Sequence, residues 1–167
     1  MKKANRIPQI ERPDWPDYGV SAAQTTQMLE WFWVDEALAR SRNYWITSTR
    51  TDGRPHAMPV WGLWHEGQLF FGTSRNSVKG RNLLADPRTV VHLESGDEVV
   101  ILEGKVTEIT DLDQYREIFK IYAQKYKGFE PSEGIDPGQV LFAFTPQTAL
   151  AWTEQTYPGS VTRWRFG

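Results

Sequence analysis

The chain has 167 residues, three histidines, no cysteine and a formal net charge of −2 at pH 7. The absence of cysteine excludes disulfides, thiolate metal sites and cysteine nucleophiles, and the near-neutral charge argues against a general nucleic-acid-binding surface. Hydrophobic residues make up 40% of the chain and include eight Trp. This composition is typical of one globular domain with a sizeable core, and the surplus of Trp suits a dimer interface or a ring-binding pocket.

No apolar run is long enough to cross a membrane as a helix, for which about 18 residues are needed. The N-terminal "MKKANRIPQI" has two lysines but lacks the apolar segment of a secretory signal. We therefore expect a cytoplasmic protein that has neither a membrane nor a nucleic acid as its partner.

The N-terminal residues 1–20 contain three prolines and mixed charges, so we expect an extended arm that precedes a single domain over residues 21–167. Ser21 and Gln24 have the spacing of a capping box, which predicts a helix over about residues 21–40. Its apolar residues occupy most sides of the helix, and such a helix is usually buried on more than one side, for instance under a partner subunit.

From residue 43 onward, β-branched and aromatic residues predict a series of short strands. Asp-Gly after the first of them indicates a hairpin turn, and Pro59 in the second indicates a bulge or an edge strand. The expected strands are "YWITST" (44–49), "HAMPVWGLW" (56–64), "LFFGT" (69–73), "TVVHLE" (89–94), "VVILEGKVTEI" (99–109), "QVLFAFTP" (139–146), "ALAWTE" (149–154) and "SVTRWRF" (160–166).

Two further helices are expected, over Val78–Ala85 and from Asp111 to about Lys127, where Asp111 and Gln114 repeat the capping-box spacing. A loop rich in Gly and Pro follows over residues 128–138. Many short strands and few helices favour a closed or nearly closed β-barrel. The sequence contains neither the dinucleotide-binding fingerprint nor a P-loop.

The segment between the third strand and the short helix carries an unusual number of groups that can hold an anion. It offers hydroxyls at Thr73, Ser74 and Ser77 and cations at Lys79 and Arg81. The first N–H groups of a helix lack internal partners and carry the positive end of its dipole, so cations beside them are unfavourable unless an anion binds there. The alternative is that Ser77 caps the helix and both cations are solvated.

Other aromatic and basic residues have two interpretations each. Gly62 either lets a ligand approach the backbone or marks a bulge. Trp152 and Trp164 provide either stacking surfaces or packing, and the two arginines beside Trp164 either bind a ligand or protect an edge strand. No catalytic acid or base stands out, and the scattered histidines favour no metal site. These are His56, His65 and His92.

The stretches "TDGRPHAMPVW", "GQLFFGTSRNSVKGRNLLADPRTVVHLESGD" and "ILEGKV", in this order, resemble the pyridoxamine 5′-phosphate oxidase-like, FMN-binding split-barrel superfamily. The resemblance extends over roughly residues 25–166. It implies a mainly β (α+β) fold, a six-stranded split β-barrel with peripheral helices, and a homodimer with flavin sites at its interface. It also implies cofactor-binding residues: Thr73, Ser74, Ser77 and Lys79, with Arg81 beside them, at the phosphate, and Met58, Pro59, Val60 and Trp61 along the ring.

Two departures count against pyridoxamine phosphate oxidation itself, because Met58 and Leu63 stand where those oxidases carry Arg and Lys. The pattern from Lys79 to Arg88 resembles the branch that includes users of the deazaflavin F420. The resemblance therefore implies an FMN-binding oxidoreductase that transfers a hydride to or from a small organic substrate. The alternatives are an F420-dependent reductase and a non-enzymatic flavin or tetrapyrrole carrier on the same fold.

Overall fold

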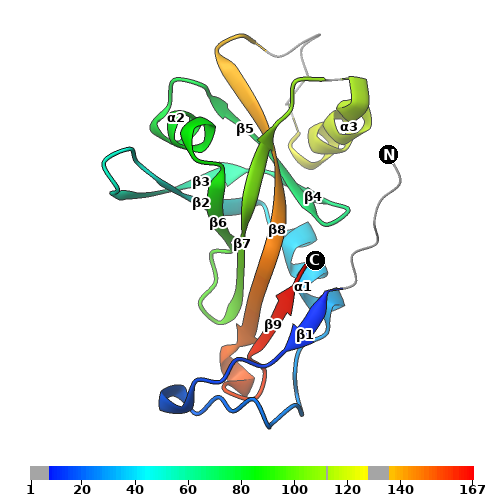
Figure 1. Ribbon diagram of the computed structural model, residues 1–167. Helices are drawn as coiled ribbons and strands as arrows, with labels where there is room; N and C mark the ends of the chain where they lie inside the picture. The colour runs from blue at the N-terminus through cyan, green and yellow to red at the C-terminus, as the bar shows by residue number, and fades with distance from the viewer. Residues whose placement is uncertain (1–7, 112, 128–135) are drawn as a thin grey trace.

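The computed structural model describes residues 8–111, 113–127 and 136–167, and an antiparallel sheet forms its centre (Figure 1). Three α-helices lie at the periphery: α1 (Trp31–Arg40), α2 (Val78–Ala85) and α3 (Arg116–Lys125). The strands are β1 (Gln9–Glu11), β2 (Asn43–Thr49), β3 (Pro55–Trp61), β4 (Leu63–His65), β5 (Gln68–Ser74), β6 (Arg88–His92), β7 (Glu98–Glu108), β8 (Gln139–Thr153) and β9 (Thr162–Arg165). Short 3₁₀ turns occupy Pro16–Tyr18, Asp113–Tyr115 and Glu154–Thr156.

The strands follow the order β1-β9-β8-β7-β6-β2-β3, and the sheet branches at β8, which also pairs with β5, itself paired with β4. Within the described residues β3 pairs only with β2, so the sheet curls without closing. This confirms the predicted mainly β split barrel with peripheral helices. Six strands have five or more residues, and the three-residue β1 and β4 and the four-residue β9 add to them.

The core lies between the curled strands and α1. Alternate residues of β2 point inward, among them Tyr44 and Ile46, because successive side chains of a strand face opposite sides of the sheet. Helix α1 contributes Val34 and Leu38 to the same cluster. Trp164 is also buried there, so of the two interpretations given to it, packing is correct.

The helix expected over residues 21–40 begins only at Trp31, so the prediction is wrong for its first ten residues. Ser21 is the first residue of a turn and not a helix cap, since its carbonyl accepts a hydrogen bond from the N–H of Gln24 at 3.1 Å. Gln27 has a φ of 76°, in the left-handed region, which interrupts any helix at that point. The helix was also expected to be buried on more than one side, but Phe32 on α1 is 71% exposed in the single chain.

Strand β8 replaces the two strands predicted over residues 139–146 and 149–154. Its register with β7 passes from Gly104 opposite Pro146 to Glu103 opposite Thr148, so Gln147 is an extra residue, a β-bulge. Before the bulge the buried side chains include the even-numbered Val140, Phe142 and Phe144, and after it they are the odd-numbered Ala149 and Ala151. The change in alternation explains why the sequence suggested two strands.

The strand predicted over residues 56–64 is divided at Gly62 into β3 and β4. A Cβ at Gly62 would lie 2.9 Å from Leu69 and 3.1 Å from Tyr44, so the chain passes too close to its neighbours for any larger residue. Pro59 lies on β3, an edge strand, as one of its two interpretations predicted.

Two further predictions need adjustment. The helix expected from Asp111 starts at Arg116, after a 3₁₀ turn whose Asp113 N–H donates to the Asp111 carboxylate at 3.0 Å. Most of the loop predicted over residues 128–138 lies outside the described residues. The N-terminal arm packs as β1 against β9. No helix among the described residues is long and apolar enough to cross a membrane.

Candidate functional site

The turn from β5 into α2 is closed by the side chain of Ser77. Its Oγ accepts a hydrogen bond from the N–H of Gly80 at 2.9 Å and donates to the carbonyl of Ser74 at 2.8 Å. Ser77 is thus the N-cap of α2, which agrees with the first part of the alternative interpretation. The first N–H groups of α2, which no carbonyl of the helix can satisfy, therefore lie at this turn.

Gly80 makes this tight turn possible. A Cβ at this position would lie 2.3 Å from the carbonyl oxygen of Ser74 and 3.0 Å from that of Arg75. Real Cβ atoms do not approach backbone atoms so closely, so a larger residue would push α2 away from the end of β5.

The hydroxyls predicted to bind an anion lie together at this turn. The Oγ1 of Thr73 is 3.2 Å from the Oγ of Ser77, and the Oγ of Ser74 accepts from the N–H of Asn76 at 3.3 Å. Arg81 is exposed, and its guanidinium donates to the carbonyl of Asn76, so it braces the turn from outside.

Three basic side chains gather beside the turn. Lys79 is half-buried, and its burial lowers the pKa of its ammonium group. Burial lowers the pKa of His56 as well, and the positive charges of Arg50 and Lys79 lower it further, so both cations lie near this histidine. Within the described residues no carboxylate forms an ion pair with Arg50 or Lys79, and the buried Nδ1 of His56 has no hydrogen-bond partner.

We call these groups the anion cradle: Arg50, His56, Thr73, Ser74, Ser77, Lys79 and the N-terminal N–H groups of α2. Unpaired, partly buried cations and an orphaned ring nitrogen are costly unless something compensates them. A phosphate group carries negative charge and several acceptor oxygens, so it fits both deficits. A bound phosphate would therefore compensate these groups together.

The residues predicted along the cofactor ring divide between the two faces of β3. Met58 and Val60 are paired in register with the inward-facing Ile46 and Tyr44. His56, paired with Ser48, lies on the same face, over which α2 packs through a hydrogen bond from Asn82 to Ser48 at 3.0 Å. Met58 is nevertheless 45% exposed, because the barrel is open beside β3. This face therefore leads directly from the cradle along an accessible strand.

Pro59 and Trp61 lie on the outward face of β3. Trp61 stacks on Tyr126 with ring centroids 4.8 Å apart and planes 9° apart, and the guanidinium of Arg42 lies 5.2 Å from the centre of the Trp61 ring. Trp61 is still 48% exposed. Of the four residues, Val60 is buried in the core, so a ligand along β3 would meet its backbone.

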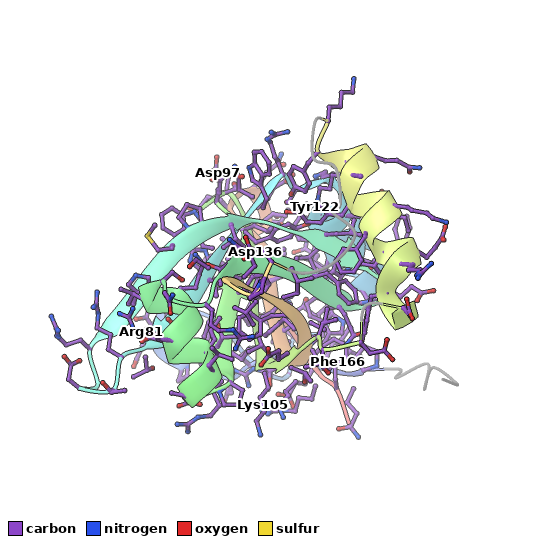
Figure 2. All side chains as sticks on the ribbon, turned by 90° about the horizontal axis from the view of Figure 1, so that it is seen from above. Arg81, Asp97, Lys105, Tyr122, Asp136 and Phe166 are labelled. Carbon is purple, nitrogen blue, oxygen red and sulfur yellow. The ribbon has the colours of Figure 1, made fainter. Side chains whose placement is uncertain are left out.

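Lys125 lies behind this aromatic group. Its Nζ donates to the carbonyl of Gly62 at 2.9 Å and to the hydroxyl of Tyr44 at 3.1 Å. Burial, followed by the charge of Arg42, lowers the pKa of Lys125 to about 8. Seen from above, α3 lies on the opposite side of the barrel from α2, with Tyr122 on one side and Arg81 on the other (Figure 2). Lys125 thus fastens α3 to the break between β3 and β4.

Sequence reasoning missed two members of the cradle. His56 was interpreted as an ordinary strand residue, and Arg50 drew no attention because it lies in the hairpin turn. The sequence feature that could have identified both residues is the Asp-Gly turn. It fixes the pairing of Thr49 with Pro55, and that register brings the turn arginine and His56 to the same end of the hairpin. No group of three or more side chains that could hold a metal ion occurs among the described residues.

The family described as Pyridoxamine 5′-phosphate oxidase matches residues 34–153. A comparison with curated proteins gave no match. Several solved structures share the fold. A conserved hypothetical protein from Mycobacterium tuberculosis has a TM-score of 0.65 and 20% identity, over 75% of this chain and 86% of that one.

Two other similar structures have descriptions that name a cofactor. One is described as an F420 reductase, with a TM-score of 0.56 and 21% identity over 69% of this chain and 94% of that one. The other is a pyridoxamine 5′-phosphate oxidase-related, FMN-binding protein from Nostoc punctiforme, with a TM-score of 0.55 and 16% identity over 74% of this chain and 81% of that one. At these identities the likeness concerns the fold.

Proposed function

We propose that this chain, which belongs to the pyridoxamine 5′-phosphate oxidase family, is an oxidoreductase that binds FMN and transfers a hydride to or from a small organic substrate. The observation that carries the proposal is the anion cradle, with Lys79, His56 and Arg50 unpaired beside a capped helix N-terminus. The FMN phosphate supplies the charge and acceptors that these groups lack. When bound, the flavin ring supplies the hydride chemistry.

The chain itself binds and orients the ring. The phosphate in the cradle anchors one end of the cofactor, and β3 runs away from the cradle with Met58 exposed on the same face as His56. A planar ring along this strand would meet mainly its backbone, because Val60 is buried. The strand would then exclude water from one face of the ring and leave the other face to a substrate.

The deazaflavin F420 is the second candidate cofactor. It has the same planar tricycle and a phosphate on a ribityl tail, so the cradle suits both cofactors equally. The specific observations in its favour are the segment from Lys79 to Arg88, which resembles the F420 branch, and the structural likeness to a protein described as an F420 reductase. The ring electronics, not the phosphate, distinguish the two.

Titration of the cofactor-free protein with FMN and with F420 tests the proposal. The preferred cofactor should bind at micromolar concentration or tighter, and reduction of the loaded protein followed by addition of nitroaromatic or quinone acceptors should restore the oxidised absorption. A protein that binds the cofactor but never passes electrons to any acceptor is a carrier. A protein that binds neither cofactor contradicts the proposal.

We also propose that two copies of the chain form a homodimer. The outward face of the sheet supports this, because α2 packs on the opposite face and the outward side chains include stacked Trp45 and His92 rings, 6.1 Å apart. By register this face continues from β7 to β3. Its uncharged members include Trp45, Thr47, Ala57, Pro59, Trp61, Val90, His92 and Ile101, and the same register places the charged Arg88, Glu103 and Lys105 on it.

A stable dimer should bury more than about 1,200 Å² of surface. Light scattering should give twice the mass of one chain at micromolar concentration. Ala57→Glu places a charge in the middle of the outward face and should yield monomers, whereas Leu84→Glu on exposed α2 should leave the mass unchanged. A monomeric wild type, or a dimeric Ala57→Glu, would be inconsistent with this interface.

A further inference from the structure

A separate cavity of about 460 Å³ lies between the N-terminal arm and the far end of β8. Its walls carry four aromatic side chains and two carboxylates, and no basic residue lines it. These residues are Asp14, Trp15, Asp17, Tyr18, Trp152 and Tyr157. The segment that follows β1 lies at the lower end of the molecule in Figure 1, whereas α2, whose N-terminus belongs to the anion cradle, lies at the upper end.

The walls of this cavity are held in place by bonds that link distant parts of the chain. Trp15 and Val20 exchange two backbone hydrogen bonds, of 2.9 and 3.1 Å, which close the turn that carries Asp17 and Tyr18. The hydroxyl of Tyr157 donates to the carbonyl of Tyr18 at 3.2 Å, which joins the turn to the loop after β8. The buried Arg12 donates to the carbonyl of Gly159. A ligand would therefore meet a preformed site.

The chemistry of the walls selects positive charge. Aromatic faces attract cations, and the guanidinium of Arg163 already lies 5.7 Å from the centre of the Trp15 ring. Within the described residues neither Asp14 nor Asp17 forms an ion pair, so their charge is available to a ligand. The aromatic rings favour a cation with a weakly hydrated, apolar surface over a strongly hydrated primary ammonium group.

We propose that this cavity binds a small organic cation that carries a quaternary or methylated ammonium group, and that it is a site separate from the cofactor cradle. The volume lies within the range of small-molecule sites, about 300–1,000 Å³. The site explains why exposed Tyr18, at 69%, and Tyr157, at 38%, gather beside two carboxylates. It does not rest on the proposed function, because no cradle residue contributes to it.

Choline and its neutral, equally sized analogue 3,3-dimethyl-1-butanol test the proposal. They are titrated into the cofactor-free, full-length chain while the indole N–H signals of ¹⁵N-labelled protein are recorded, and Trp152→Leu identifies its own signal. Choline should shift the signals of Trp15 and Trp152, and should bind at least about tenfold more tightly than the neutral analogue. Equal affinities, or shifts confined to other Trp residues, overturn the proposal.

The double variant Asp14→Asn/Asp17→Asn separates charge from packing, since Asn retains the oxygen that accepts from the N–H of Ala22. It should weaken choline binding by about three- to tenfold and leave the neutral analogue unaffected. Glu103→Gln removes an exposed carboxylate from β7 and Lys79→Ala alters the cradle, and neither should change choline affinity. Unchanged binding in the double variant, or lost binding in Lys79→Ala, contradicts a separate cation site.

Discussion

The two ends of β8 present opposite chemistry. At its start, residues 139–144 pair with β5, which leads into a cradle of unpaired cations and hydroxyls. At its end, Trp152 helps to line a cavity that carries two carboxylates and aromatic rings. In both places the described residues leave charged side chains without an ion-pair partner. One strand framework can thus hold two sites whose ligands cannot exchange, because their charges differ in sign.

Gly80→Ala should disturb the cradle end of β8 more than any other single substitution. A Cβ 2.3 Å from the Ser74 carbonyl forces α2 away from β5, which should cost about 2–3 kcal/mol of stability and abolish cofactor binding. Gly96→Ala is the matched control, since nothing lies within 4 Å of the added Cβ. Urea unfolding followed by cofactor titration measures both effects. A Gly80→Ala protein with wild-type stability would show that the turn is not as tight as described.

Lys79→Ala should remove the principal charge of the cradle while sparing the fold. A hydrogen bond to a charged group contributes about 1.5–3 kcal/mol, so the cofactor dissociation constant should rise roughly tenfold to a hundredfold. Lys79→Arg should retain part of the affinity. Lys105→Ala, at an exposed position of β7, is the control. Calorimetric titration decides the matter, and equal constants for wild type and Lys79→Ala would mean that Lys79 is a solvated surface lysine.

Ser77→Ala tests whether the Ser77 hydroxyl both caps α2 and binds the phosphate. Loss of the cap should destabilise the fold by about 1 kcal/mol, and the cofactor should bind several-fold more weakly. Ser95→Ala, which removes the side-chain acceptor of another turn, should affect stability alone. Thermal unfolding in the absence and presence of cofactor distinguishes the two contributions. An affinity that does not change would assign Ser77 to the cap only.

Lys125 is half-buried like Lys79, but its ammonium group has neutral acceptors, the Gly62 carbonyl and the Tyr44 hydroxyl. Lys125→Met should therefore leave cofactor affinity nearly unchanged. The pKa of Lys125 is about 8 in the folded state, below the 10.5 of an unperturbed lysine. Between these values the unfolded chain binds more protons, so the contribution of Lys125 to stability rises with pH.

Urea unfolding of wild type and Lys125→Met at several pH values from 7 to about 10 measures this small effect. The wild type should gain stability relative to the variant as the pH rises through about 8, because the cost of a buried positive charge disappears. The charge of Arg42 acts on this ammonium group, and the rings of Tyr44 and Tyr126 lie beside it. A stability difference that is independent of pH would mean that Lys125 titrates as an exposed lysine.

The predictable parts of the molecule are those that neighbouring residues build. The Ser77 cap and its adjoining lysine stand within one turn of sequence, so their pattern was readable. Arg50 and His56 join them only through the pairing of β2 with β3, and the distant cavity joins residues 14–18 to Trp152 across the whole chain. The Asp-Gly turn is the sequence signal for the first of these meetings, whereas no residue pattern signals the second.

The errors in the predicted elements have local causes. The capping-box spacing of Ser21 and Gln24 suggested a helix, but Gln27 has a left-handed backbone conformation and the helix begins only at Trp31. Alternation of apolar residues predicted the strands well, and it failed where the alternation itself changes, at Gln147 and at Gly62. Backbone irregularities thus escaped prediction although the fold class did not.

The bulge at Gln147 constrains how the length of this chain can vary. A single residue inserted into or deleted from β8 before the bulge would move every later side chain of the strand to the opposite face of the sheet. Trp152 would then point toward the core and away from the cavity. A second change of one residue before Trp152 restores the original phase. Viable length variants of β8 are therefore expected to carry such changes in compensating pairs, whereas the loops that join the strands can vary one residue at a time.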